Sequence, residues 1–344
     1  MSGEAMYLRP SEAAQRVGAS AKALRLYEQR GLVKPVRTAA GWRAYGPQEI
    51  ERAAEVVALR AMGLSLASIG RALNGEAGEL ERALAAHQAA LERQSAQVAA
   101  ATAQVRRLRA DLAQGRVAGV GDICRVVQPK SEVKAAFALP WPWGGEWFEL
   151  RDVRAINYIV GPLGSGKTRF ARCIADTLPR ARFIGLERAT DGGAAARRRI
   201  EDDPRLKARV DEALAWLIED GASQSGALLT LLADLEASDA SALVVDMVEQ
   251  GLDQATQEAL IAHLRRRSGV DPVLFLMTRS SAVLDLAAVS ADEGIILCPA
   301  NHRPPTRVAP HSGSPGYEAV ATCLAPPDVR ARTEGVIAWR PEVA

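Results

Sequence analysis

Eight consecutive residues carry the most specific chemistry in this sequence. Residues 161–168 read Gly-Pro-Leu-Gly-Ser-Gly-Lys-Thr and fill every fixed position of the Walker A pattern G-x-x-x-x-G-K-[ST]. Ile156–Val160 has the composition of a buried strand, and Arg169–Ala175 continues as a helix. A strand, a glycine turn and a helix N-terminus present free N–H groups and a positive dipole end to a phosphate. The pattern therefore predicts a site for a nucleoside triphosphate.

The residues of this site divide into phosphate and metal ligands. Lys167 would reach the outer phosphates, and the Thr168 hydroxyl would coordinate Mg²⁺. A second metal ligand is Asp246, which ends the apolar run Ala242–Val245 as the acidic residue of a Walker B strand does. The predicted cofactors are ATP and Mg²⁺. The predicted nucleotide-binding residues are Gly161, Pro162, Leu163, Gly164, Ser165, Gly166, Lys167, Thr168 and Arg169.

The segment after Asp246 resembles a known class of ATPase. Residues 247–260 are similar to the stretch of ABC-type ATPases that contains the D-loop. Residues 223–226, Ser-Gln-Ser-Gly, lie where those proteins carry their signature sequence. The resemblance covers residues 140–300 and implies a P-loop α/β fold with a parallel sheet.

Departures from that class concern hydrolysis more than binding. The signature is degenerate, Met247 replaces the usual catalytic Glu, and Arg279 stands in the place of the switch His. Glu249 is either a displaced catalytic base or an exposed loop residue. Because hydrolysis needs a positioned water and charge stabilisation beyond what binding needs, the sequence supports binding and leaves slow turnover open. Trp141 or Trp143 either stacks on the adenine or belongs to a packed strap.

Length and composition set the frame for these motifs. The 344 residues are enough for two domains with separate cores, and 48% hydrophobic and 24% charged residues are typical of a globular protein. No apolar run reaches membrane-spanning length and the N-terminus lacks a signal-peptide core, so we expect a cytoplasmic protein without a membrane partner. The four cysteines are scattered, which favours free thiols and leaves a metal site at Cys124 as an alternative.

The first 75 residues have the organisation of a winged helix-turn-helix. The pattern predicts helices over Pro10–Val17 and Ala21–Arg30, a hairpin within 33–45, and helices over Pro47–Met62 and Ser65–Leu73. Two short helices about three residues apart can place the second one in a DNA major groove. Residues 1–75 also hold 11 Lys/Arg against 6 Asp/Glu, in a chain whose net charge is +2. This asymmetry indicates a polyanionic partner.

Three stretches of this region resemble the MerR (mercury-resistance regulator) family. Residues 24–32 are similar to its "LRYYE..GL" core, residues 42–45 to its wing, and residues 62–69 to its "LGxSLxxI" segment. The resemblance covers residues 7–115. It implies a homodimer that binds and distorts a pseudo-palindrome in double-stranded promoter DNA, with RNA polymerase as a further partner.

Basic and phenolic side chains in these motifs are suited to phosphate contacts. Guanidinium and ammonium groups neutralise phosphates, and tyrosine hydroxyls donate hydrogen bonds to them. For Tyr27 a core position is the alternative. The predicted DNA-binding residues are Lys22, Arg25, Tyr27, Arg37, Arg43 and Tyr45.

The segment 80–112 contains no Gly or Pro and carries a heptad seam. Such a narrow stripe over more than four heptads is typical of a coiled coil, and it predicts a homodimer. His87 and Gln94 fall on the seam, where they set register rather than bind a ligand. The seam consists of Leu80, Leu84, His87, Leu91, Gln94, Val98, Ala101, Val105, Leu108 and Leu112.

Together these features predict a multidomain fold: an all-α winged helix-turn-helix with a long coiled-coil dimerisation helix, followed by an α/β P-loop NTPase domain. The expected boundaries are 1–75, 76–115, a linker over 116–139, and 140–344. The expected function is transcription regulation by a DNA-binding dimer whose effector domain binds ATP. The alternatives are a DNA-localised ATPase or kinase and an ABC-like ATPase of DNA maintenance.

Overall fold

The structure is a computed structural model of the 344-residue chain. Contacts divide the chain into two compact units. The first comprises residues up to Lys134 together with Glu149–Val153, and the second comprises Ala135–Phe148 and residues from Arg154 onward. The structure describes residues 7–19, 21–38, 41–62, 64–75, scattered positions between 80 and 110, 134–237, 239–267, 272–290 and 292–331.

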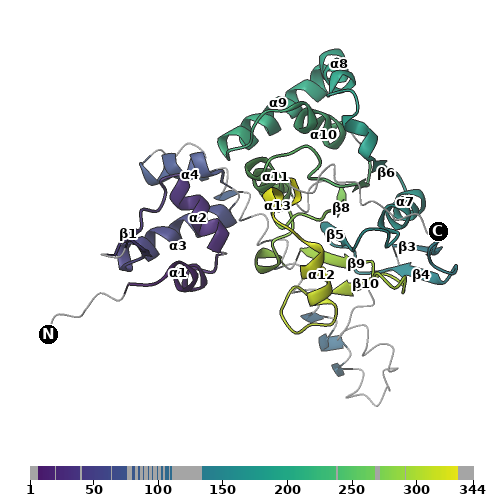
Figure 1. The fold of residues 1–344 in the computed structure, drawn as a ribbon, viewed down its shortest axis with the longest axis horizontal. Coiled ribbons are helices and arrows are strands. Elements are labelled where there is room, and N and C mark those ends of the chain that lie inside the picture. Colours follow the sequence, from purple (N-terminus) through teal and green to yellow (C-terminus); the bar gives the residue numbers. More distant parts are fainter. Residues whose placement is uncertain are drawn as a thin grey trace, which may run out of the picture. The chain divides into compact units, whose positions relative to one another are not determined.

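Among the residues described up to Gly75, the first unit contains the helices α1, α2, α3 and α4 and a two-stranded hairpin, and Figure 1 shows how these helices lie. Hydrophobic side chains from all four helices share one core, in which Leu24, Val56 and Ile69 are almost completely buried. The Ser65 side chain accepts a hydrogen bond from Ser68 N and caps the fourth helix, as expected of serine at this position. The elements are α1 (Pro10–Arg16), α2 (Ala21–Gln29), β1 (Val36–Arg37), β2 (Arg43–Ala44), α3 (Pro47–Ala61) and α4 (Leu66–Leu73).

The predicted order of helix, helix, hairpin, helix, helix is therefore confirmed. Gly31 adopts φ of +70° directly after α2, which explains why a glycine ends this helix. The antiparallel hairpin pairs Val36 with Ala44 and Arg37 with Arg43.

The described positions between 80 and 110 are helical, in agreement with the predicted long helix. Of the seam residues, Leu84 and Val105 are exposed hydrophobic side chains. His87, Gln94 and most other seam positions lie outside the described residues. The coiled coil and the homodimer remain predictions.

The second unit is built on a six-stranded sheet with the order β10-β9-β5-β8-β7-β6. Only β10 is antiparallel to its neighbour. The four central strands, β9, β5, β8 and β7, are buried almost throughout, as parallel strands covered by helices require, whereas the edge strands β10 and β6 are only partly buried. The strands of the sheet are β5 (Ile156–Val160), β6 (Ala181–Ile184), β7 (Ala242–Val245), β8 (Val273–Met277), β9 (Glu293–Leu297) and β10 (Thr306–Val308).

Helices α8, α9 and α10 pack on one another and form a separate helical group between β6 and β7 in sequence (Figure 1). Helix α11 contacts α9, while α7 lies against the sheet. The helices of the unit are α7 (Lys167–Thr177), η1 (Leu186–Ala189), α8 (Ala194–Asp202), α9 (Pro204–Glu219), α10 (Gly226–Glu236), α11 (Gln254–Arg267), η2 (Leu286–Ala288), α12 (Tyr317–Cys323) and α13 (Pro327–Ala331).

The predicted fold class is confirmed: a helical N-terminal region with a wing-like hairpin is followed by an α/β domain. The predicted linker over 116–139 extends too far. β3 (Ala135–Ala138) pairs with β4 (Trp147–Leu150), and Ala135 and Phe137 alternate inward as a half-buried strand requires. Residues 116–133 lie outside the described part of the chain.

One buried histidine makes the stability of the second unit sensitive to acid. His263 of α11 is enclosed against the Trp216 ring of α9 at 5.3 Å between centroids. Neither ring nitrogen has a hydrogen-bond partner among the described residues. Burial, reinforced by the Arg266 and Arg267 cations, lowers the pKa of His263 from 6.5 to about 3. The unfolded chain therefore takes up a proton that the folded chain rejects, and stability falls as pH drops below 6.5 toward 3.

When the pH falls from 7 to 5, we expect the unfolding free energy of the wild type to fall by about 2 kcal/mol more than that of His263→Leu. Urea denaturation at both pH values measures this difference. His311→Leu, on an exposed loop, serves as the control and should retain the wild-type pH dependence. An unchanged pH dependence in His263→Leu would contradict the assignment.

Candidate functional site

The phosphate-binding loop lies between β5 and α7, as the sequence predicts. Gly164 and Gly166 have φ of +78° and +87°, a conformation that suits glycine. A side chain at Gly161 would collide with the Cys298 carbonyl oxygen, and one at Gly166 would lie 2.7 Å from the Trp143 ring. The loop is therefore shaped by close backbone packing against two neighbouring segments.

The Lys167 side chain folds back over this loop. Its ammonium donates to the carbonyl oxygens of Gly161 at 2.8 Å and Pro162 at 2.7 Å. Burial lowers the pKa of Lys167. The hydroxyl of Ser165 is buried in the same loop and has no hydrogen-bond partner among the described residues. The loop thus holds a partly desolvated cation beside an unsatisfied hydroxyl, a combination suited to an anion.

The second half of the site comes from β7. Thr168 Oγ1 at the start of α7 donates to Asp246 Oδ2 at 3.2 Å, although the two residues are 78 positions apart. Asp246 is buried, and this burial raises the pKa of its carboxyl, whereas Thr168 and Arg188 oppose the shift. A hydroxyl and a carboxylate at one point are oxygen ligands of the kind Mg²⁺ prefers, with waters and phosphates completing its shell. The residues present fit the predicted metal.

Arg188 of η1 supports this carboxylate, and no sequence motif identified it. Its guanidinium donates to the carbonyl oxygens of Gly185 at 2.8 Å, Asp246 at 2.7 Å and Met247 at 2.6 Å. These bonds tie the end of β6 to the end of β7. Met247 has φ of +43°, so the chain turns sharply where an ABC-type ATPase carries its catalytic Glu.

Glu249 is placed differently from the exposed loop residue considered above. Its side chain is buried, with 3% of the residue exposed. Oε1 accepts a hydrogen bond from Arg279 N at 2.9 Å and forms an ion pair with the Arg330 guanidinium of α13. The exposed-loop interpretation is wrong, and in this arrangement the carboxylate is engaged by a cation rather than turned toward a water. The prediction of Glu249 as a catalytic base is not supported by this geometry.

The signature-like segment has a clear structural role. Ser225 caps α10 by accepting a hydrogen bond from Leu228 N at 3.1 Å. A side chain at Gly226 would collide with the Gly192 carbonyl oxygen, so the starts of α8 and α10 approach backbone to backbone.

The two tryptophans before β4 have different positions. Trp143 is 4% exposed, and its indole N–H donates to the Arg303 carbonyl oxygen at 2.9 Å. Trp141 is 70% exposed. The Arg169 guanidinium carbon lies 4.6 Å from the Trp141 ring centroid, and its Nη1 donates to the Trp141 carbonyl oxygen at 3.2 Å. Trp143 is therefore the packed strap, and Trp141 is the ring with an accessible face next to the loop.

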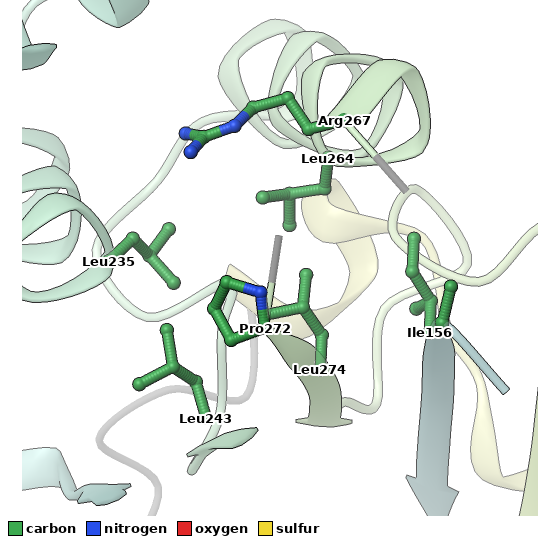
Figure 2. Close-up of a pocket in the computed structure, with 8 residues that line it drawn as sticks. Ile156, Leu235, Leu243, Leu264, Arg267, Pro272 and Leu274 are labelled. Carbon is green, nitrogen blue, oxygen red and sulfur yellow. The ribbon is translucent and has the colours of Figure 1, made fainter. Parts of the chain in front are cut away.

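A small cavity elsewhere in the unit is not part of this site. It has a volume of about 30 Å³ and lies at the amino ends of β5, β7 and β8, where Ile156, Leu243 and Leu274 line it (Figure 2). The phosphate-binding loop leaves the opposite, carboxyl end of β5. The cavity is apolar and about the size of one water molecule, so it offers no room for a substrate.

In the first unit, the predicted DNA-binding residues separate into surface and core groups. Arg25 on α2 and Arg37 on β1 are exposed. Arg43 forms an ion pair with Glu28 of α2 at 2.9 Å. Nothing is assigned to the Lys22 side chain, which lies outside the described part of the chain.

The two tyrosines belong to the core. Tyr45 is completely buried, and its hydroxyl donates to the Glu28 carboxylate. Its predicted role as a phosphate donor is therefore wrong, because the hydroxyl is used to fix the wing on α2. Tyr27 is buried as well, which agrees with the alternative of a core residue. Trp42, beside the wing, is 75% exposed, and the predicted DNA-binding residues do not include it.

The family model for the MerR HTH family regulatory protein matches residues 8–76. The N-terminal region is a MerR-type helix-turn-helix domain. A stretch of 64 residues, 18% of the chain, is 45% identical to a probable heavy metal-dependent transcriptional regulator of Haemophilus influenzae. This match spans half of that relative's length. The MerR-type domain is thus shared, and the rest of the chain is not covered by this relative.

Two solved structures have similarities to parts of the chain. One is HiNmlR, a MerR family regulator lacking the sensor domain, bound to promoter DNA. The match has 22% sequence identity and a TM-score of 0.25, and it covers 30% of this chain and 94% of that chain. The other is an inward-facing putative metal-chelate type ABC transporter. This match has 15% sequence identity and a TM-score of 0.34, and it covers 52% of this chain and 81% of that chain. Both TM-scores are below 0.5, so neither likeness supports a functional statement about this chain. No helix among the described residues is long and apolar enough to cross a membrane.

Proposed function

We propose that this chain is a DNA-binding transcription regulator whose α/β domain is an effector domain for ATP and Mg²⁺. The MerR-type domain supports the DNA-binding half of the proposal. The hydrogen bond between Thr168 and Asp246, next to the folded-back Lys167, carries the nucleotide half. The bond unites two motifs from distant parts of the sequence at one edge of the sheet. That convergence is what a magnesium nucleotide requires.

Each part of the nucleotide has a counterpart among these residues. The N–H groups of the loop and the Lys167 ammonium would hold the phosphates, since a helix N-terminus and a cation favour negative charge. Thr168 and Asp246 would coordinate Mg²⁺, which would neutralise charge on the phosphates. The exposed Trp141 ring would stack on the adenine.

Hydrolysis is less well supported than binding. Met247 has no basic atom, and the Glu249 carboxylate is paired with Arg330. A general base needs a carboxylate or imidazole within hydrogen-bond reach of the attacking water. We propose that the domain retains ATP and turns it over slowly, which suits a sensor better than a motor.

The DNA-binding half of the proposal rests on α2 and the wing. Arg25 and Arg37 are exposed there, and the Glu28 contacts with Arg43 and Tyr45 hold the wing against α2. The surface pairs basic residues with a fixed wing, as a groove-reading module needs. Dimerisation through residues 80–112 would align two such modules on a pseudo-palindromic promoter site, where RNA polymerase would be a further partner.

The two halves would be coupled by closure of the effector domains. In a dimer, two copies of the α/β domain are held at high effective concentration, so that even a weak ATP-dependent contact can form. Closure would change the spacing or twist of the DNA-reading modules and hence the preferred DNA shape.

The alternatives are less well supported. A kinase needs an acceptor site, and the sequence shows no motif for one beyond the phosphate-binding loop. A DNA-maintenance ATPase of the ABC-like type needs a long coiled-coil insertion between the loop and the signature segment. In this chain, α8 and α9 and the strand β6 occupy that interval.

The nucleotide assignment predicts that Lys167→Ala abolishes ATP binding and leaves the MerR-type domain folded. Lys167 supplies the full positive charge at the outer phosphates, and a charge-assisted contact of this kind is about twice as strong as a neutral one. Isothermal titration with ATP and Mg²⁺ measures the loss. Arg199→Ala, whose guanidinium pairs with Asp234 in the helical group, is the control. Wild-type ATP affinity in folded Lys167→Ala protein would rule out the site.

The DNA-binding assignment predicts that Arg25→Ala weakens binding to a selected operator by about 1–3 kcal/mol and reduces its salt dependence. Arg52→Ala, on α3, removes an arginine that pairs with Glu55 and serves as the matched control. Fluorescence anisotropy at several salt concentrations reports both quantities. Equal losses for the two variants would contradict a specific role of α2 in docking.

A further inference from the structure

The C-terminal part of the described chain pairs with the end of β8. Ala325 bridges to Ser280 in parallel, Ala325 N donates to the Arg279 carbonyl oxygen at 2.9 Å, and Ser281 N donates to the Ala325 carbonyl oxygen at 3.1 Å. Helix α13 follows directly, beginning at Pro327. Residues 324–331, which we call the C-terminal clasp, are thus attached to the carboxyl edge of the sheet.

This attachment point is level with the phosphate-binding loop. In the register of β5 and β8, Ile159 pairs with Met277, and Thr278 N donates to the Ile159 carbonyl oxygen at 3.4 Å. Arg279 follows Met277 by two residues, just beyond the end of β8, and β8 neighbours β5, the strand that leads into the loop at Gly161. The clasp is therefore anchored at the end of β8, next to β5, the strand that leads into the phosphate-binding loop.

A buried ion pair closes the clasp. Arg330 of α13 pairs with Oε1 of Glu249, and the same oxygen accepts from Arg279 N. Only 1% of the Glu249 side chain and 17% of the Arg330 side chain are exposed. The second carboxylate oxygen, Oε2, is buried and has no hydrogen-bond partner among the described residues. The carboxylate therefore holds the guanidinium with only half of its hydrogen-bonding capacity.

Positive charge gathers at this edge. The cation of Arg279 adds to burial in lowering the pKa of Lys167, and Lys167 and Arg279 both act on the thiol of Cys323, just before the clasp, whose pKa burial raises. Because β5, β8 and β7 are adjacent and parallel, the loop after β5, Arg279 after β8 and Glu249 after β7 all follow the carboxyl ends of neighbouring strands. The Arg330 guanidinium, which pairs with Glu249, therefore lies at the same edge of the sheet as Lys167.

We propose that Arg330 is a ligand of the terminal phosphate of a bound nucleoside triphosphate, for which that phosphate competes with Glu249. This inference rests on the proposed nucleotide site. A guanidinium binds a phosphate through two parallel hydrogen bonds, whereas Glu249 offers it one oxygen that is already shared. A nucleoside diphosphate lacks the competing group and leaves the clasp closed. The clasp thereby distinguishes triphosphate from diphosphate.

The test is the ratio of ADP to ATP dissociation constants, measured by titration calorimetry with Mg²⁺ on the full chain. Arg330→Gln should lower the preference for ATP about tenfold or more while changing ADP affinity little, because a charge-assisted contact to the third phosphate is lost. Glu249→Gln should raise the preference, since a neutral amide competes less well for the guanidinium. Arg267→Gln is the matched control: Arg267 pairs with buried Glu236 but lines the cavity at the opposite edge of the sheet.

An unchanged ATP preference in folded Arg330→Gln protein would overturn the inference. If that variant does not fold, Glu249→Gln decides, and a preference equal to or below that of the wild type overturns it. Loss of binding of both nucleotides in the wild type would instead refute the nucleotide site itself. A change in Arg267→Gln equal to that in Arg330→Gln would show that the effect is one of stability and not of phosphate contact.

Discussion

The candidate site depends on one hydrogen bond, from the Thr168 hydroxyl to the Asp246 carboxylate. The bond requires that α7 begin where β7 ends, although β8 lies between the strand of the loop and β7. The parallel register of β5, β8 and β7 meets this requirement by aligning their carboxyl ends. Arg188 then fixes the turn after β7 through three carbonyl oxygens. The helical group and the C-terminal clasp are attached around this arrangement.

Much of this arrangement was predictable from the sequence. Glycines with fixed spacing and a lysine before a threonine specify a loop, and an apolar run ending in Asp246 specifies its partner strand. The helices of the MerR-type domain could also be predicted, because residues such as Ser65 and Gly31 mark where a helix begins or ends. Local signals of this kind are strong where backbone geometry restricts the residue type.

Other features depend on tertiary contacts that no local pattern encodes. Glu249 was read as a base or a loop residue because nothing in its neighbourhood reveals a partner 81 positions away on α13. Arg188 belongs to no motif, and its three acceptors are backbone carbonyls, which carry no sequence signal. Tyr45 was predicted to face DNA, yet its ring fills the core and its hydroxyl meets Glu28. Tyr45 directly follows the short strand β2, and the sequence alone does not distinguish an aromatic residue there that faces inward from one that faces outward.

In the MerR-type domain, contacts of Glu28 with the wing region set the orientation of the proposed DNA-binding surface. Glu28 lies on α2 and holds both Arg43 and Tyr45 of the wing region, so the orientation of the wing is linked to that of the helix. Two buried or half-buried contacts thus share one carboxylate and fix the wing on the helix. This rigidity is what a nucleotide-dependent change in DNA shape would need in order to reach the DNA.

We propose that nucleotide binding in the α/β domain alters DNA binding by the MerR-type domain. The most direct measurement is operator affinity of the full chain without nucleotide and with ATP and Mg²⁺, with Lys167→Ala as the control. We expect ATP to change the operator affinity of the wild type by about fivefold or more and operator DNA to change ATP affinity by the same factor. Lys167→Ala should show neither effect. Equal operator affinity and identical DNA distortion with and without ATP would contradict it.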